Sequence, residues 1–236
     1  MNTHPGVIGR KLGMTQVFAE DGSVVPCTVV EASSIVVGKR TLEKDGYDAL
    51  VLGMGGDMKE GRANKPLAGQ YKKSNLPPKA MLRELRCTAE FAAGFEIGHD
   101  LKIDQVFEAG QFVDVRGITR GRGFTGVMRR HNFSGYRMTH GTHEYRRHGG
   151  SIGTRMTPGR VKLGQKMPGH YGNETVSILS QPIVKVLPEQ NAVLIRGGIP
   201  GARGGLVTVR GAVKRAGGKN TGEKRAPEKK TGKGGK

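Results

Sequence analysis

Short apolar runs, separated by turn residues, dominate the first part of the chain. Alternation of apolar and polar positions predicts β-strands at 7–12, 14–18, 24–31, 35–40 and 47–54. The pair Asp21-Gly22 lies between two of these runs and indicates a hairpin turn. Strands this short, joined by turns this frequent, are typical of a barrel or a sandwich rather than of a parallel α/β sheet.

The pattern changes in the segment 55–93. Asn64 is placed to cap a helix that has a proline in its first turn and runs to about residue 73. A second short helix is expected after the two prolines at 77–78, with one apolar face made of Met81, Leu82 and Leu85. We interpret 55–93 as a small α/β insertion that packs beside the barrel.

Further strands are predicted at 100–103, 112–118, 175–179, 183–187, 192–195 and 206–210. Between 118 and 173 no apolar period of 3.6 or 2 residues lasts longer than one turn. The chain is therefore expected to leave the β domain after one strand and to return before the next. We predict a mainly β protein: a discontinuous β-barrel domain (1–118 and 173–210), a long extended loop (119–172) and a disordered basic tail (211–236).

Charge is distributed unevenly over these parts. The formal net charge is +19. Residues 1–115 hold 14 Lys and Arg against 15 Asp and Glu, whereas residues 116–172 hold 12 against 1 and residues 173–236 hold 13 against 4. The first half has the charge of an ordinary globular domain, and the positive excess belongs to the loop and the tail. Nucleic acid is the expected partner of such a chain.

Residue types within the loop indicate structured RNA. Glu144 is the one acidic residue between 117 and 172, where nine Arg, two Lys and five of the seven His of the chain lie. Arginine suits bidentate phosphate contacts and stacking on bases, aromatic rings stack on bases, and glycine lets the backbone approach phosphates. The predicted RNA-binding residues are Arg120, Arg122, Gly123, Phe124, Arg129, Arg130, His131, Arg137, His140, His143, Tyr145, Arg146, Arg147, His148, Arg155, Met156, Arg160, Lys162 and Lys166.

Two other kinds of site fit the loop less well. Gly121, Gly123 and Gly126 spell the dinucleotide fingerprint G-x-G-x-x-G, but neither the apolar helix nor the later acidic strand end that it requires follows. His140 and His143 lack the helical spacing of a zinc site, and the surrounding arginines repel a cation. We therefore expect no metal and no cofactor.

Catalysis is also disfavoured. Hydrolytic and nuclease sites commonly use paired or metal-binding carboxylates, and the loop offers Glu144 alone. We expect a protein that is not an enzyme and has no small-molecule substrate. Of the functions that we consider, a metal-dependent nuclease is the one that the sequence supports least.

The cysteines and the hydropathy indicate the compartment. Cys27 and Cys87 each lie among apolar neighbours, and we expect buried free thiols rather than a disulfide. The sequence shows no signal peptide and no apolar run near the roughly 20 residues of a membrane span. A cytosolic protein without a membrane partner is expected.

Several longer motifs add a family resemblance. The segments 7–15, 122–131, 150–153, 157–161, 167–169 and 201–207 occur in this order and resemble the large-subunit ribosomal protein L-three family of the bacterial type, over about 1–211. Two features depart from the family pattern. Met156 stands where many bacterial relatives carry a glutamine that is often methylated, and the tail past 211 is longer than expected.

The resemblance implies a β-barrel of the translation-protein kind and an extension that threads through ribosomal RNA towards the peptidyl transferase centre. It further implies a structural role in the large ribosomal subunit, an early role in subunit assembly, and neighbouring ribosomal proteins as partners. The alternative is an RNA chaperone or assembly factor that dissociates after folding its RNA.

Overall fold

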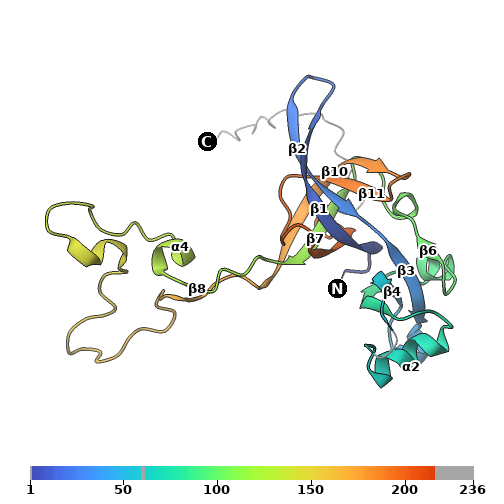
Figure 1. Cartoon of the computed structure of the whole chain (residues 1–236), viewed down its shortest axis with the longest axis horizontal. Coiled ribbons are helices and arrows are strands. Elements are labelled where there is room, and N and C mark those ends of the chain that lie inside the picture. The colour runs from blue at the N-terminus through green and yellow to red at the C-terminus, as the bar shows by residue number, and fades with distance from the viewer. Residues whose placement is uncertain (1, 60–61, 216–236) are drawn as a thin grey trace, which may run out of the picture. The chain divides into compact units, whose positions relative to one another are not determined.

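A computed structural model describes residues 2–59 and 62–215 (Figure 1). The fold is mainly β, as predicted. Six antiparallel strands form a closed barrel, in the order β1 (Gly6–Phe18), β12 (Leu206–Gly211), β7 (Phe112–Ile118), β10 (Thr175–Leu187), β11 (Ala192–Arg196) and β2 (Val24–Glu31). Most of the predicted tail, residues 216–236, lies outside the described residues.

Alternation along the strands gives this barrel an apolar interior. Successive side chains of a strand point to opposite faces, so every second apolar residue can face the interior. Val7 pairs with Val209, and Val209 pairs with Val115 on the next strand. All three are fully buried, each stabilising the fold by roughly 1.5–3 kcal/mol relative to an exposed side chain.

Two pairs of predicted strands are single strands in the structure, which corrects the expected breaks. Strand β1 continues through Gly13, with a register shift between Lys11 and Gly13. Strand β10 passes through Ser180, which has a φ of 54°, and shifts register before Lys185. A bulge interrupts the period-2 pattern for one residue while the strand continues, so in the sequence it resembles a strand end.

A second sheet lies beside the barrel. Its strand order is β5 (Lys79–Arg86), β4 (Ala49–Asp57), β3 (Ser34–Arg40) and β6 (Asp100–Leu101). The helices of this part are α1 (Leu42–Asp45), α2 (Lys65–Lys73), α3 (Ala89–Ala93) and a 3-10 turn, η1 (Ile103–Gln105). The predicted cap of α2 is confirmed, because the Asn64 side chain accepts a hydrogen bond from the Leu67 amide at 3.2 Å.

The second helix predicted in the segment 55–93 is wrong, because residues 79–86 form strand β5. This strand pairs with β4, and Leu82 and Leu85 lie opposite Gly53 and Leu50. The two leucines do not share a face. Leu85 is in the main core, whereas Leu82 packs against the cluster around Tyr71. Their i, i+3 spacing fits a helix in isolation, and pairing with β4 decides the outcome.

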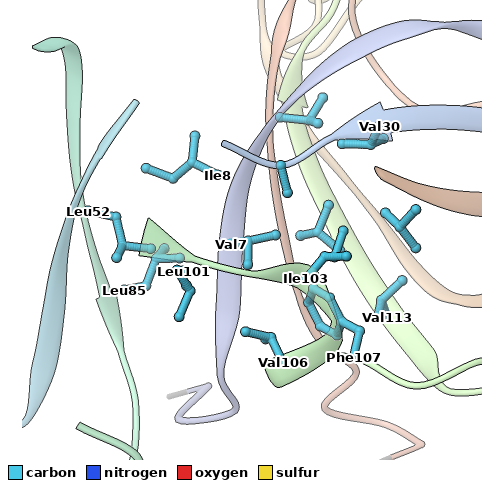
Figure 2. Packing of buried hydrophobic residues seen from close by; sticks show 14 of the residues in the cluster. Val7, Ile8, Val30, Leu52, Leu85, Leu101, Ile103, Val106, Phe107 and Val113 are labelled. Atoms are coloured by element: carbon cyan, nitrogen blue, oxygen red, sulfur yellow. The ribbon is translucent and has the colours of Figure 1, made fainter. Parts of the chain in front are cut away.

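One apolar core joins the barrel and the second sheet. Figure 2 shows Ile8 of the barrel wall close to Leu52, Leu85 and Leu101 of the sheet, all of them buried. The opposite face of the sheet packs against α2, where Tyr71 is 1 % exposed. Strand β4 contributes to both layers because its side chains alternate between them.

Contacts divide the chain into two compact units. Of the described residues, the first contains those up to Gly117 and those from Ser177 to Arg215, and the second is Ile118–Val176. Cys27 and Cys87 are buried free thiols, as predicted. None of the described helices is long and apolar enough to cross a membrane.

The first residues of the predicted disordered tail are ordered, which moves its expected start. Gly211 is the last residue of β12. Ala212 is buried and its amide donates to the Phe112 carbonyl at 3.0 Å. The Arg215 guanidinium lies 4.7 Å from the centre of the Phe112 ring. The segment 211–215 therefore packs on the first unit.

Candidate nucleic-acid interface

The second unit is a ribbon whose outgoing and returning arms are hydrogen-bonded to each other. At its base the Thr119 amide donates to the Glu174 carbonyl at 2.9 Å. Further along, the Arg122 amide donates to the Tyr171 carbonyl at 2.9 Å, and the Tyr171 amide donates to the Gly123 carbonyl at 3.0 Å. Strands β8 (Phe124–Thr125) and β9 (Gly169–His170) continue this ladder.

Glycine is required where the arms approach most closely. Gly172 has a φ of 79°, in the left-handed region that side chains other than glycine disfavour. A Cβ atom at this position would also clash with the Arg120 carbonyl oxygen. The backbone of the returning arm can therefore pass the outgoing arm only without a side chain at residue 172.

Side chains close the ladder beyond β8 and β9. The short helix α4 (Val127–His131) presents Arg130, whose Nη1 donates to the Met167 carbonyl at 2.9 Å. The Nε2 atom of His131 lies 3.1 Å from the same oxygen, where it can only donate. Both side chains are half-buried. These two predicted RNA-binding residues thus hold the ribbon together.

The distal part of the ribbon is a loop with its own cross-link. The Tyr136 amide donates to the Arg146 carbonyl at 3.0 Å, beside the 3-10 turn η2 (His143–Arg147). His140 and His143 have φ values of 59° and 42°. Left-handed conformations are costly for residues other than glycine and cluster at functional sites. The two histidines are therefore displayed on a constrained backbone.

The other predicted RNA-binding residues are exposed, in contrast to Arg130 and His131. The rings of Phe124 and Tyr145 are 80 % and 64 % exposed. Val127 is the one buried large apolar side chain among the described residues of this unit. Backbone hydrogen bonds rather than an apolar core therefore hold the ribbon, and its surface consists of cations and uncovered rings.

A dinucleotide site does not fit the glycine motif in this geometry. Of its three glycines, Gly123 has a positive φ of 64°. The helix that follows is α4, which has five residues and buries Val127 alone. A Rossmann-type crossover needs a longer apolar helix that packs on a parallel sheet, and the pair β8–β9 is antiparallel.

The histidines do not gather in the described part of the chain. No group of three or more His, Cys, Asp or Glu side chains there is arranged to hold a metal ion. His131 is committed to Met167, and the rings of Tyr145 and His148 lie 4.8 Å apart between centres. Elemental analysis of the purified protein is the test of the metal prediction.

A cavity of about 280 Å³ in the first unit was missed by sequence reasoning. Arg83, Arg116 and Arg210 line it, together with Asp114 and other residues. The Asp114 carboxylate accepts hydrogen bonds from the amides of Ser180 and Val213, at 2.8 and 3.2 Å. Glu84 lines the cavity as well, so its lining carries three arginines and two carboxylates. Their positions lie far apart in the chain, so no local signal reveals the cluster.

The guanidinium of Arg210 is partly withdrawn from solvent. Its Nη2 donates to the Arg86 carbonyl at 2.6 Å and to the Asn2 carbonyl at 2.9 Å. Burial lowers the pKa of Arg210 from its ordinary value. The carbonyl partners of Arg210 stabilise this half-buried cation without neutralising it.

Comparison with known proteins gives a consistent result. The family model described as Ribosomal protein L3 matches residues 87–192. The chain is 59 % identical over 232 residues to the large ribosomal subunit protein uL3 of Sorangium cellulosum, covering 98 % of this chain and all of the relative. Identity to the uL3 protein of Myxococcus xanthus is 49 % over 213 residues, covering 89 % of this chain and 94 % of the relative. The corresponding protein of Carboxydothermus hydrogenoformans is 46 % identical over 210 residues, or 89 % of this chain and 98 % of the relative.

Proposed function

The chain belongs to the ribosomal protein L3 family, and on this premise we propose that it binds large-subunit ribosomal RNA directly through its second unit. It is a large-subunit ribosomal protein and acts in the ribosome, in the cytoplasm. The RNA contact would be formed by the exposed members of the predicted RNA-binding set. The discontinuous barrel domain, the small insertion and the extension remain our proposed domains for this role.

One observation carries the proposal: a hydrogen-bonded ribbon that exposes its cations and rings. A segment with a single buried large apolar side chain gains little from folding on itself. Its arginines and lysines would attract the phosphate backbone, and its exposed rings would stack on unpaired bases. The ladder orders the ribbon in advance, which lowers the entropy lost on binding.

The arrangement of Arg122 and Tyr171 illustrates the two kinds of contact. The Arg122 guanidinium lies 5.1 Å from the centre of the Tyr171 ring. This cation–π contact holds the planar donor group in one orientation while Arg122 stays exposed. A phosphate or a base edge would meet a guanidinium that is already positioned.

We further propose the finer roles that the family resemblance implies. The segment around Arg155 would approach the peptidyl transferase centre. In this segment Met156 is 81 % exposed. The Thr154 hydroxyl donates to the Thr157 carbonyl and shapes this turn. The protein would act there by positioning nucleotides rather than as an enzyme. Early binding during subunit assembly and contacts with neighbouring ribosomal proteins complete the proposal.

Deletion of the ribbon tests where RNA affinity lies. Joining Thr119 to Asn173 through a short glycine bridge keeps the hydrogen-bonded base and removes residues 120–172. The first unit should stay folded and most RNA affinity should be lost. If the intact ribbon neutralises about six phosphates, log K should fall against log salt with a slope of about −4 to −5. An unchanged slope in the deletion variant would place binding elsewhere.

Stable incorporation separates this function from a chaperone role. A structural constituent should sediment with mature large subunits in high salt, at about one copy per subunit. A factor that dissociates after folding its RNA should be found with precursor particles and should be absent from mature subunits. The second result would refute the structural role and leave RNA binding intact.

A further inference from the structure

The hairpin formed by β1 and β2 has an unusual charge for this chain. Between Lys11 and Lys39 the sequence contains no Lys, Arg or His. The same stretch contains three acids, Glu20, Asp21 and Glu31. Glu31 lies opposite Arg10 at the barrel end, so the outer part of the hairpin, with Glu20 and Asp21, is locally anionic in a chain of net charge +19. Phosphate groups are repelled from such a surface.

One face of the hairpin is apolar and uncovered. Phe18 pairs with Val24 across the two strands, and Gln16 pairs with Pro26. The side chains of Phe18, Met14 and Val24 are 74 %, 58 % and 50 % exposed. Every second residue of a strand shares a face, so Met14 and Phe18 lie on the same side. They border a shallow hollow of about 540 Å³ together with Pro26.

The outer edge of β1 is also available. Its pairing with β12 ends at Arg10, and the last backbone bonds on that side join Lys11 to Gly204 and Gly205. Beyond Lys11, the described pairings of β1 are with β2 alone. Figure 1 shows the two strands continuing past the barrel as a hairpin. An edge with exposed apolar residues is a template for a further strand or another surface.

We propose that this hairpin is the docking surface for a second, basic protein of the large subunit. The partner would present an apolar patch to Phe18, Met14 and Val24, surrounded by Lys or Arg side chains that face Glu20 and Asp21. This inference rests on the proposed function, because the large subunit is where such a partner would be met. The chain would then bind RNA through its second unit and another protein through the hairpin.

Charge decides between a protein and RNA as occupant. Exposed rings can stack on bases, and Phe18 alone would fit either partner. RNA binding at Phe18 would bring phosphates close to Glu20 and Asp21, whereas the cations of the hairpin, Arg10 and Lys11, lie at its barrel end. A basic protein gains both from apolar burial and from the complementary charge, which also steers the encounter.

Site-specific photocrosslinking in assembled subunits tests the proposal. A benzophenone amino acid replaces Phe18 in the full chain, in cells that have no other copy of the gene. Leu42 provides the matched control, because it is 65 % exposed and lies in the same unit outside the hairpin. After irradiation of purified large subunits, mass spectrometry and nuclease digestion identify what is attached.

The expected result is a crosslink from position 18 to a peptide of one other large-subunit protein, which position 42 does not give. A crosslink to RNA, no crosslink, or the same products from both positions would overturn the proposal. Failure of the unsubstituted chain to enter large subunits would instead refute the proposed function, and the inference would fall with it.

Charge variants then measure how much the hairpin contributes to the affinity for the crosslinked protein. The crosslinked protein is purified and titrated against the full chain. Phe18→Lys should weaken binding by about tenfold, because it removes the central ring and adds repulsion, whereas Leu42→Lys should leave the affinity unchanged. If Phe18→Lys instead leaves protein affinity unchanged and tightens RNA binding, the hairpin is an RNA contact.

Discussion

The guanidinium of Arg130 donates a hydrogen bond to the carbonyl oxygen of Met167, 2.9 Å away and 37 residues further along the chain. The same guanidinium covers Gly169, where a Cβ atom would lie 2.6 Å from Nη1. This contact joins the outgoing and returning arms of the second unit beyond β8 and β9. Arg130 therefore stabilises the ribbon, whereas the exposed cations of the same unit are available to bind phosphates.

Replacing Arg130 with alanine should loosen the ribbon more than it weakens phosphate binding. Hydrogen bonds of charged groups contribute about 1.5–3 kcal/mol, so the amides of Gly169–Tyr171 should exchange about tenfold faster or more. Arg129→Ala is the matched control, because Arg129 is adjacent and exposed. It should leave exchange unchanged and reduce the salt slope of RNA binding by about 0.7–0.9. Equal exchange rates in both variants would contradict the structural role of Arg130.

Gly172→Ala should disrupt the base of the ribbon. The substitution combines a left-handed φ of 79° with a clash against the Arg120 carbonyl. Gly164→Ala isolates the first effect, since Gly164 has a φ of 78° and open space around its Cβ position. We expect a cost of about 1–2 kcal/mol for Gly164→Ala and clearly more for Gly172→Ala. Proteolysis of the ribbon measures both, and similar rates would show that the clash is relieved.

Glu84 should stabilise the fold at neutral pH and not in acid. Its carboxylate accepts hydrogen bonds from the Tyr47 hydroxyl at 2.7 Å and from Arg40 at 2.9 Å, and these contacts lower the pKa of Glu84. A lowered pKa in the folded state gives stability that is complete above the ordinary value of 4.5 and is lost as pH falls through the folded value.

Glu84→Gln should therefore reduce the free energy of unfolding at neutral pH by about 0.5–1 kcal/mol, a small value because the group is partly exposed. The difference from the unmodified protein should shrink towards about pH 3. Urea titrations at both pH values measure it. Asp57→Asn removes the ion pair between Asp57 and Lys79. The Asp57 side chain is more exposed than that of Glu84, so this substitution should reduce the free energy of unfolding by less. A difference that persists unchanged in acid would contradict the assignment.

The thiols of Cys27 and Cys87 should be inert in the folded protein. Burial raises the pKa of both thiols, so less of the reactive thiolate is present at a given pH. Labelling with a chromogenic disulfide should be slow in native buffer and about 100-fold faster in urea. The variants Cys27→Ser and Cys87→Ser assign each rate. Rapid native labelling of either thiol would show that its strand opens readily.

Local signals in the sequence predicted the fold well where a few adjacent residues determine the structure. The turn at Asp21-Gly22 is confirmed, since Gly22 has a φ of 76° and its amide donates to the Ala19 carbonyl. The cap at Asn64 is confirmed for the same reason. The helix predicted after Pro78 is wrong because residues 79–86 pair with β4, which lies more than twenty residues earlier. The bulge of β1 at Lys11–Gly13 and the positive φ of Ser180 in β10 coincide with the two predicted strand breaks.

The sequence predicts which segment holds the candidate site, but not which of its side chains face outward. Composition and charge identify the region, because cations and rings accumulate there in the chain. Whether a given cation faces outward depends on contacts between the two arms, as Arg130 and Met167 show. The three arginines around the cavity of the first unit are brought together by β5, β7 and β12, and no local pattern shows this.

The pairing of β1 with β12 has a consequence for synthesis of the chain. Translation proceeds from the amino terminus, so β1 is complete long before its neighbour Leu206–Gly211 exists. Until then β7 also lacks a partner on that side, and the barrel stays open. The whole arginine-rich segment between β7 and β10 is thus synthesised before the barrel can close. The nascent chain therefore carries this segment in full before the barrel can be completed.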